Sequence, residues 1–174
     1  YDSEKSMVDL PSPVDISFGS IDLREAIEKR RSIRTYSKQP ITIDELSWLL
    51  WCTQGVKSIT NVPSTLRVVP SGGARHPFET YILVNRVDGL QRGLYRFLAL
   101  SHKLVEHNLE DGLAERVTDI CWNQPFVMES AITFIWTFIP YRGIWRYGER
   151  AFRNILEVGH ICQNLYLSAE AIDC

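Results

Sequence analysis

The stretch KRRSIRTYSKQPITIDELSWLLWCTQGV, residues 29–56, decides how the rest of the chain is organised. Thr42 and Glu45 have the spacing of a capping box, and Gly55 is a natural stop for the helix that this box would begin. Apolar residues recur at helical spacing between the two signals: Ile43, Leu46, Leu49 and Leu50. The pattern predicts an amphipathic helix that directly follows a cluster of four cations between Lys29 and Arg34.

A second helix is predicted before the cations, over DLREAIEKRR, with Asp22 and Glu25 in capping-box spacing. Its C-terminal end would deliver the cationic cluster. Arginines with a neighbouring serine supply the bidentate donors and the hydroxyl that bind a phosphate. The same charges also suit the negative end of a solvated helix, so both interpretations stay open on spacing alone. Residues 1–20 show no clear periodicity and predict an irregular arm.

Downstream of residue 56, the pattern alternates between loops, strands and helices. It predicts a loop over 68–77, a strand over 79–85, a hairpin over 93–108 that turns at Ser101-His102, a helix over 110–122, a buried strand over 131–139 and a helix over about 149–172. This order is typical of a mixed α+β domain and not of a repeated βαβ unit.

Composition excludes several classes of function. The 174 residues suffice for one domain, and a net charge of −2 argues against a general nucleic-acid-binding protein. The longest apolar run, AITFIWTFI, has nine residues, too few for a membrane-spanning helix. The N-terminal residues contain no signal-peptide core, and we expect a cytoplasmic protein.

Cysteine and histidine spacing favours no metal site. The four cysteines form no CxxC pair, which predicts free and mostly buried thiols in a reducing compartment. His102 and His107 fall in the predicted hairpin and are expected at the surface. His160 falls in an apolar helix and is expected to be a satisfied core histidine.

Two further segments could carry chemistry. In PSGGARHP, residues 70–77, adjacent glycines would let a ligand approach the backbone closely, although a plain surface turn explains them as well. In WRYGERAFR, residues 145–153, the arginines could form an exposed helix face, or Arg146-Tyr147 could line a pocket. The sequence has no G-x-S-x-G, H-E-x-x-H or G-x-G-x-x-G motif, so a hydrolase or a dinucleotide-binding fold has no support.

Taken together, these segments resemble the nitroreductase family of flavin enzymes. EAIEKRRSIRTYSKQPITIDELSWLLWCTQGV resembles the opening of that family, and RVVPSGGARHPFETYILVN followed by GLYRF is similar to its SagB-type dehydrogenase branch. YGERAFRNILEVGHICQNLYLSAEAI is similar to the last long helix of the branch. The likeness covers residues 21–174, which would form one FMN-binding domain after the arm of residues 1–20.

The resemblance implies an α+β fold with a mostly antiparallel central sheet flanked by helices, an intertwined homodimer, and two FMN molecules held between the chains. It places Arg30, Arg31 and Ser32 at the FMN phosphate. Arg34 would lie at the N1/O2 edge of the flavin, where its charge stabilises the reduced ring. Flavin contacts from the other chain are implied for Pro70, Ser71, Gly72, Gly73 and Ala74. The pocket-lining candidates are His76, Trp145 and Tyr147, and the candidate catalytic residues are Arg34 and Tyr147.

Two features depart from the family pattern. Azoline-oxidising members carry a Lys-Tyr pair where this chain has Arg146-Tyr147, and arginine stays protonated and is a poor general base. Family members also continue past the equivalent of residue 174 into a loop at the flavin and a tail around the partner. We therefore expect this chain to be a fragment or to lack its end.

The resemblance implies an oxidoreductase that transfers hydride from NADH or NADPH to FMN and then reduces a small nitro- or quinone-like molecule by a ping-pong mechanism. The alternatives are an oxygen-using relative that fragments flavin, a peptide azoline dehydrogenase, an FMN-binding module without turnover, and a protein that uses its basic patch to hold an acidic partner.

Overall fold

The central sheet of the computed structural model, which describes residues 5–18, 20–62 and 64–174, has five strands in the order β1-β6-β5-β4-β7. Every pairing in this sheet is antiparallel. A separate hairpin is formed by β2 and β3. The strand bounds are Met7–Asp9 (β1), Val56–Ile59 (β2), Thr65–Arg67 (β3), Phe78–Val84 (β4), Gly93–Leu98 (β5), Lys103–Asn108 (β6) and Ile132–Phe138 (β7).

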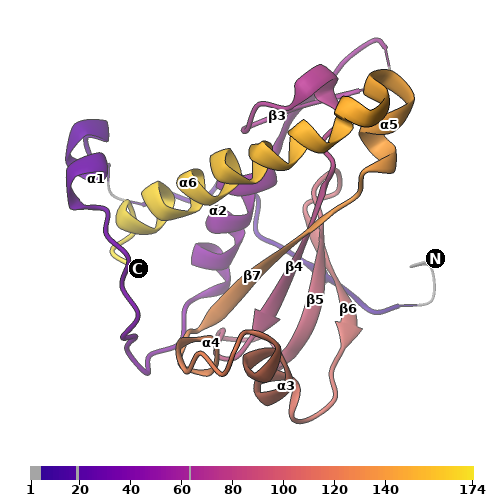
Figure 1. Cartoon of the computed structure of the whole chain (residues 1–174). Coiled ribbons are helices and arrows are strands. Elements are labelled where there is room, and N and C mark those ends of the chain that lie inside the picture. The colour runs from indigo at the N-terminus through magenta and orange to yellow at the C-terminus, as the bar shows by residue number, and fades with distance from the viewer. Residues whose placement is uncertain (1–4, 19, 63) are drawn as a thin grey trace.

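Helices gather mainly on one face and at the ends of the sheet (Figure 1). Their bounds are Leu23–Lys29 (α1), Ile43–Gln54 (α2), Leu113–Ile120 (α3), Phe126–Glu129 (α4), Tyr141–Tyr147 (α5) and Glu157–Glu170 (α6), with 3₁₀ segments at Gly72–Ala74 (η1) and Gly148–Leu156 (η2). None of the helices in the described part of the chain is long and apolar enough to cross a membrane.

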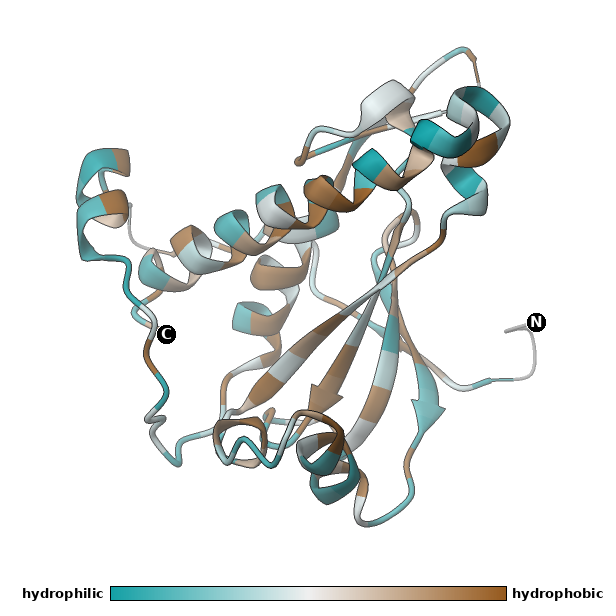
Figure 2. Ribbon diagram, in the orientation of Figure 1, coloured by the Kyte–Doolittle hydropathy of each residue, from teal (hydrophilic) through white to brown (hydrophobic). Residues whose placement is uncertain are grey.

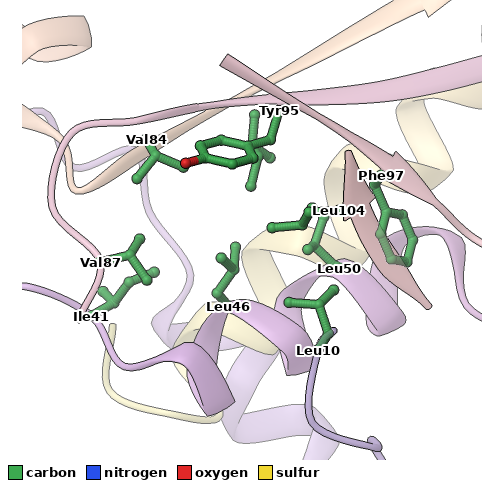
Figure 3. Close-up of a cluster of buried hydrophobic side chains, with 10 residues drawn as sticks. Leu10, Ile41, Leu46, Leu50, Val84, Val87, Tyr95, Phe97 and Leu104 are labelled. Carbon is green, nitrogen blue, oxygen red and sulfur yellow. The ribbon is translucent and has the colours of Figure 1, made fainter. Parts of the chain in front are cut away.

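The main core lies between α2 and the sheet (Figure 3). Leu46 and Leu50 of α2 are fully buried against β4, β5 and β6, because they share one helical face. Tyr95 is also fully buried, and its hydroxyl donates a hydrogen bond to the Gln91 carbonyl at 2.8 Å. Burial of these side chains removes apolar surface from water, which is the dominant favourable contribution to folding.

A second, smaller core forms where the N-terminal part of α6 packs on β4 and β7. Ile161 of α6 belongs to the cluster that contains Val69 and Phe78, and the rings of Phe78 and Phe138 are tilted against each other with centroids 5.3 Å apart. From this point α6 runs across α2 towards α1 (Figure 1), and Asn164 donates to the Cys52 carbonyl of α2 at 3.0 Å. One side of α6 is therefore fixed to the body. Apolar residues recur along the helix (Figure 2), and Leu156 at its start and Tyr166 near its end are exposed.

Much of the predicted fold is confirmed. The α+β class and the mostly antiparallel sheet are present, as are the helices after Asp22 and Thr42 and the hairpin around Ser101-His102. Both halves of the Thr42–Glu45 capping box form, with Glu45 N donating to Thr42 Oγ1 at 3.2 Å. The pattern did not predict the β2–β3 hairpin or α5.

Predictions about burial were less accurate. The strand at 131–139 is not fully buried, because β7 is an edge strand whose residues are half-buried or exposed. The prediction of an irregular arm was wrong for Met7–Asp9, which pairs with β6. Residues 1–4 and 19 of that arm lie outside the described residues.

The histidine and cysteine predictions also need correction. His102 is half-buried and lies 2.7 Å from Ser47 Oγ, whereas His107 is exposed as expected. His160 is exposed and not in the core, because it falls on the outer side of α6. The cysteines are free, but none is fully buried: Cys52 and Cys162 are half-buried, and Cys121 and Cys174 are exposed.

Asn85 ties the end of β4 to the α4 turn, and replacing it should weaken the fold. Its buried amide donates to the Val127 carbonyl at 2.8 Å and to the Ser130 carbonyl at 3.0 Å. Asn85→Asp would set a carboxylate against these carbonyls and should lower the free energy of unfolding by about 3–5 kcal/mol at neutral pH. Urea denaturation would measure the change. Asn61→Asp, at an exposed bend, is the control, and equal stability of both variants would contradict the assignment.

Candidate functional site

The predicted phosphate-binding segment follows α1 directly and is exposed. Arg31, Ser32 and Arg34 are exposed, and within the described residues neither Arg31 nor Arg34 forms an ion pair. Arg30 is half-buried, and its guanidinium lies over the ring of Tyr166 at 5.5 Å from the centroid. These cations therefore keep most of their hydrogen-bonding capacity for a ligand.

The backbone of this segment has few internal partners: Gln39 N donates to Ser37 Oγ at 3.3 Å, and the Ser37 carbonyl accepts from Arg86 Nη2 at 3.0 Å. Between Arg30, which still donates to the Ala26 carbonyl, and Ile41, which donates to Arg86, the described chain forms no backbone–backbone hydrogen bond. Buried or ligand-bound backbone groups need partners, and an exposed segment obtains them from water or from another molecule. An extended, cationic segment with few internal hydrogen bonds is suited to binding an anion.

The glycine loop is held in a defined shape by its own contacts. Gly72 N donates to Glu157 Oε1 at 2.8 Å, His76 N donates to Ser71 Oγ at 2.8 Å, and Ala74 N donates to the Ser71 carbonyl at 3.0 Å. These amides are therefore not open to a ligand. Pro70 and Gly72 are nonetheless exposed, so the outer surface of the loop can pack against a flat molecule.

Arg146 and Tyr147 lie against this loop. The contact brings together two segments that are far apart in the sequence. A Cβ atom at Gly73 would stand 2.4 Å from the Tyr147 hydroxyl and 3.2 Å from Arg146 Nε. Gly73 also has a φ of 62°, in the left-handed region. Glycine is thus needed at this position for two reasons, and the close contact places the Tyr147 hydroxyl at the edge of the candidate site.

Within one chain, the two halves of the predicted site lie at opposite ends of α6 (Figure 1). The glycine loop is bonded to Glu157 at the N-terminal end, and Arg30 stacks on Tyr166 near the C-terminal end. Nine residues of helix separate these anchors by ~14 Å along the axis. The phosphate segment and the glycine loop of one chain are therefore kept apart.

His76 lies in the wall of a cavity of about 530 Å³, behind the glycine loop. It is buried, and its Nε2 lies 2.9 Å from the Thr65 carbonyl. Burial, followed by the nearby Arg67, lowers the pKa of His76 to about 4, so the ring is neutral at neutral pH. Trp145 lines the same cavity, whereas Tyr147 does not.

Sequence reasoning missed several residues of this cavity. Arg67, Arg75, Tyr141 and Arg142 all line it. Arg67 lies three residues before the glycine loop and Arg75 lies within it, and this adjacency in the sequence could have identified both. The contribution of Arg142 depends on α5, which the pattern did not predict. Within the described residues, no three His, Cys, Asp or Glu side chains come close enough together to hold a metal ion.

Comparison with known protein families identifies one match. The model of the nitroreductase family matches residues 27–173. A protein of Methanocaldococcus jannaschii, provisionally named a nitroreductase, is 33% identical over 153 residues, which is 87% of this chain and 75% of that protein. The trifolitoxin-processing protein TfxB of Rhizobium leguminosarum bv. trifolii is 31% identical over 115 residues, which is 61% of this chain.

Solved structures show the same fold. A provisionally named nitroreductase from Anabaena variabilis superposes with a TM-score of 0.73 and 24% identity over 97% of this chain, and one from Ralstonia eutropha with a TM-score of 0.72 and 20% identity over 97% of it. A chain of the Escherichia coli microcin synthetase McbBCD complex, with truncated pro-MccB17 bound, gives a TM-score of 0.59 at 22% identity over 90% of this chain.

The relatives differ in how much of their length this chain spans. It covers 73% of the Ralstonia chain and 62% of the McbBCD chain. It covers 34% of the Anabaena chain and 30% of the trifolitoxin-processing protein.

The two adjacent glycines of the loop should respond differently to substitution. Gly73→Ala would combine a left-handed φ with the contact to the Tyr147 hydroxyl, and should lower the free energy of unfolding by ~1–3 kcal/mol. Gly72→Ala is the matched control, because its new Cβ would stand 3.4 Å from the nearest atom, an ordinary contact. Denaturant unfolding of both variants would measure the difference, and equal losses would contradict the described loop geometry.

Proposed function

The chain belongs to the nitroreductase family, and we propose that it is an FMN-dependent oxidoreductase whose flavin site lies between two copies of the chain. The observation that carries the proposal is the separation of the two half-sites at opposite ends of α6. A two-fold axis that crosses α6 would set two copies of the helix antiparallel. Each phosphate segment would then face the partner's glycine loop.

The residues present fit FMN. Two unpaired arginines and the Ser32 hydroxyl offer charge-assisted hydrogen bonds to a phosphate. Beside the glycine loop, the buried Asn154 Nδ2 has no hydrogen-bond partner among the described residues, and it would stand 3.7 Å from a Cβ at Gly72. An orphaned buried donor is costly unless a ligand satisfies it.

The outer side of α6 supports the two-chain arrangement. Leu156 is 74% exposed at the start of the helix, and exposed residues continue along one face through Gly159 and Gln163 to Tyr166. A Cβ at Gly159 would meet no atom within 4 Å, so the chain itself does not require glycine there. Glycine in a helix interior costs about 1 kcal/mol relative to alanine, and close approach of a second helix would offset that cost.

Each chain residue would have a defined task. Arg30, held by its stacking on Tyr166, would bind the phosphate together with Arg31 and Ser32. Arg34 would place a permanent positive charge at the flavin edge where reduction adds electrons. Tyr147 Oη, at the edge of the glycine loop, would donate a hydrogen bond to the acceptor. Pro70, Ser71, Gly72, Gly73 and Ala74 would present the surface on which the partner's flavin packs.

Bound FMN would supply the redox chemistry: a hydride from NADH or NADPH, which leaves as NAD⁺ or NADP⁺, and one proton from water would together provide the two electrons and two protons that reduce a nitro- or quinone-like acceptor. Yellow protein that bleaches anaerobically on addition of NADH or NADPH, and recovers its colour with an acceptor, would support turnover. Colour without bleaching would indicate an FMN-binding module instead, and analysis of the flavin after turnover under oxygen would reveal fragmentation.

A second candidate, a peptide dehydrogenase, is favoured by the likeness to the trifolitoxin-processing protein over 61% of this chain. Such an enzyme would remove two hydrogens from a precursor peptide, with oxidised FMN as the electron acceptor. Arg146 weighs against this candidate, because it replaces the lysine of the azoline-oxidising members and arginine does not accept a proton at neutral pH. A loss of two mass units from a peptide incubated with the yellow protein would support this candidate over the simple reductase.

Substitutions in the cationic segment should change flavin binding in different ways. Ser32→Ala should cost about 1 kcal/mol of FMN affinity, because one hydrogen bond to the phosphate is lost. Arg34→Ala should weaken binding and also lower the flavin reduction potential, since the reduced ring loses its neighbouring positive charge. Fluorescence titration and spectroelectrochemistry would measure the two quantities. Lys38→Ala, at an exposed position beyond the cluster, is the control, and an unchanged potential in Arg34→Ala would refute the role of Arg34.

Substitution at Gly159 should separate the two chains. Gly159→Leu would place a bulky side chain where the second helix is proposed to cross, and should shift sedimentation equilibrium from dimer to monomer. Glu115→Leu, on the exposed face of α3, is the control for added apolar surface on a helix. A wild-type protein that sediments as a monomer at micromolar concentration in the presence of FMN would contradict the two-chain site.

A further inference from the structure

The cavity behind the glycine loop carries an excess of positive charge. It lies between the β2–β3 hairpin, residues 74–76 and α5, and has a volume of about 530 Å³. Its lining residues are Ile59, Ser64, Thr65, Arg67, Ala74, Arg75, His76, Leu100, Tyr141, Arg142 and Trp145. Three of these residues are arginines, and none of the described lining residues is an aspartate or glutamate.

The three arginines are held in place mostly by neutral groups. Arg67 Nη1 donates to Gln54 Oε1 at 2.8 Å, and Arg75 Nε donates to the Gly73 carbonyl at 2.8 Å. Arg142 Nη1 donates to the His76 carbonyl at 2.9 Å, and its other terminal nitrogen pairs with Glu79. Fixed guanidinium groups with free N–H donors are a pre-organised receptor for a carboxylate or a phosphate.

Glu79 cannot neutralise this group. Its carboxylate is shared between Arg142 and Arg96, whose Nη2 lies 2.9 Å from Glu79 Oε2. Arg67 therefore has no carboxylate of its own among the described residues. Burial, and then the proximity of Arg142, lower the pKa of Arg67, and His76 is kept neutral by burial and by the same arginines. Both effects indicate that positive charge is crowded here and that a bound anion would relieve it.

The mouth of the cavity adds a flat apolar surface. Trp145 is 64% exposed and Tyr141 is 78% exposed, and the Arg75 guanidinium lies over the Trp145 ring at 4.8 Å from its centroid. Exposed aromatic rings beside cations bind planar groups by stacking and apolar contact. The combination of rings and arginines selects for a flat molecule that carries a negative charge.

We infer that this cavity binds the anionic group, carboxylate or phosphate, of a planar substrate, with Arg67 and Arg75 as its principal ligands and Trp145 as a stacking surface. The inference deepens the proposed function by naming the class of substrate. It rests on the proposed function only in taking the bound molecule to be an electron donor or acceptor. Binding itself needs only the fold, because the cavity is lined by one chain.

The test is isothermal calorimetry of the full protein with benzoate and with its neutral isostere benzamide. We expect benzoate to bind at low salt and benzamide to bind at least tenfold more weakly. Arg67→Gln and Arg75→Gln should each weaken benzoate binding by about tenfold, the loss of one charge-assisted contact. Arg67→Lys should recover part of the affinity, because it restores the charge without the bidentate geometry.

The control is Arg92→Gln, because Arg92 is exposed and lines neither described cavity. Equal affinity for benzoate and benzamide, absence of benzoate binding, or an equal loss in Arg92→Gln would each overturn the inference. Because calorimetry needs no flavin, this result is independent of whether the protein is yellow. If the proposed flavin chemistry is wrong, benzoate can still bind, and if benzoate does not bind, the proposed flavin chemistry is unaffected.

Nucleotide affinities of Arg67→Gln and of the wild type would identify the molecule that carries the anion. If Arg67→Gln raises the Kd for NADPH by about tenfold and leaves that for NADH unchanged, the cavity binds the 2′-phosphate of the donor. If both nucleotides bind Arg67→Gln as tightly as they bind the wild type while benzoate binding is about tenfold weaker, the anion belongs to the acceptor.

Discussion

The position of α6 across α2 and the end of the sheet is the constraint on which the rest of the structure depends. Ile161 anchors its inner side in the second core, and Asn164 bonds it to α2. The two ends of the helix then hold two polar segments in place through Glu157 and Tyr166. Because a helix is rigid over this length, these segments cannot meet within one chain. This separation is the physical reason for proposing a site that two chains share.

Features set by neighbouring residues could be predicted from the sequence. The capping box needs only Thr42 and Glu45, which are three residues apart. The cationic cluster is visible directly in the sequence between Lys29 and Arg34. The exposure of His160 could not be predicted, because it depends on which side of α6 meets α2. The arginine-lined cavity could not be predicted either, since Arg67, Arg75 and Arg142 come from β3, the glycine loop and α5. Only the fold brings these residues together.

Charge is distributed in two distinct ways in this molecule. On the surface, ordinary ion pairs such as Lys29–Glu25 contribute little to stability and need no functional explanation. Two cavities that share Arg67 are lined by four arginines, and Glu79 is the only aspartate or glutamate among their described lining residues. Such an arrangement lowers stability unless an anion offsets the repulsion. Unfavourable charge arrangements are common at functional sites. We therefore interpret these arginines as part of a functional site and not as a stabilising feature of the fold.

The segment between Arg30 and Ile41 forms no backbone–backbone hydrogen bonds of its own among the described residues, and this has a thermodynamic consequence. If flavin and partner both order this segment, whichever binds first removes the entropic cost for the other. Linkage then requires that FMN tighten association of the chains by the same factor by which association tightens FMN. Dilution would therefore release cofactor, and cellular flavin supply would set how much of the protein is assembled.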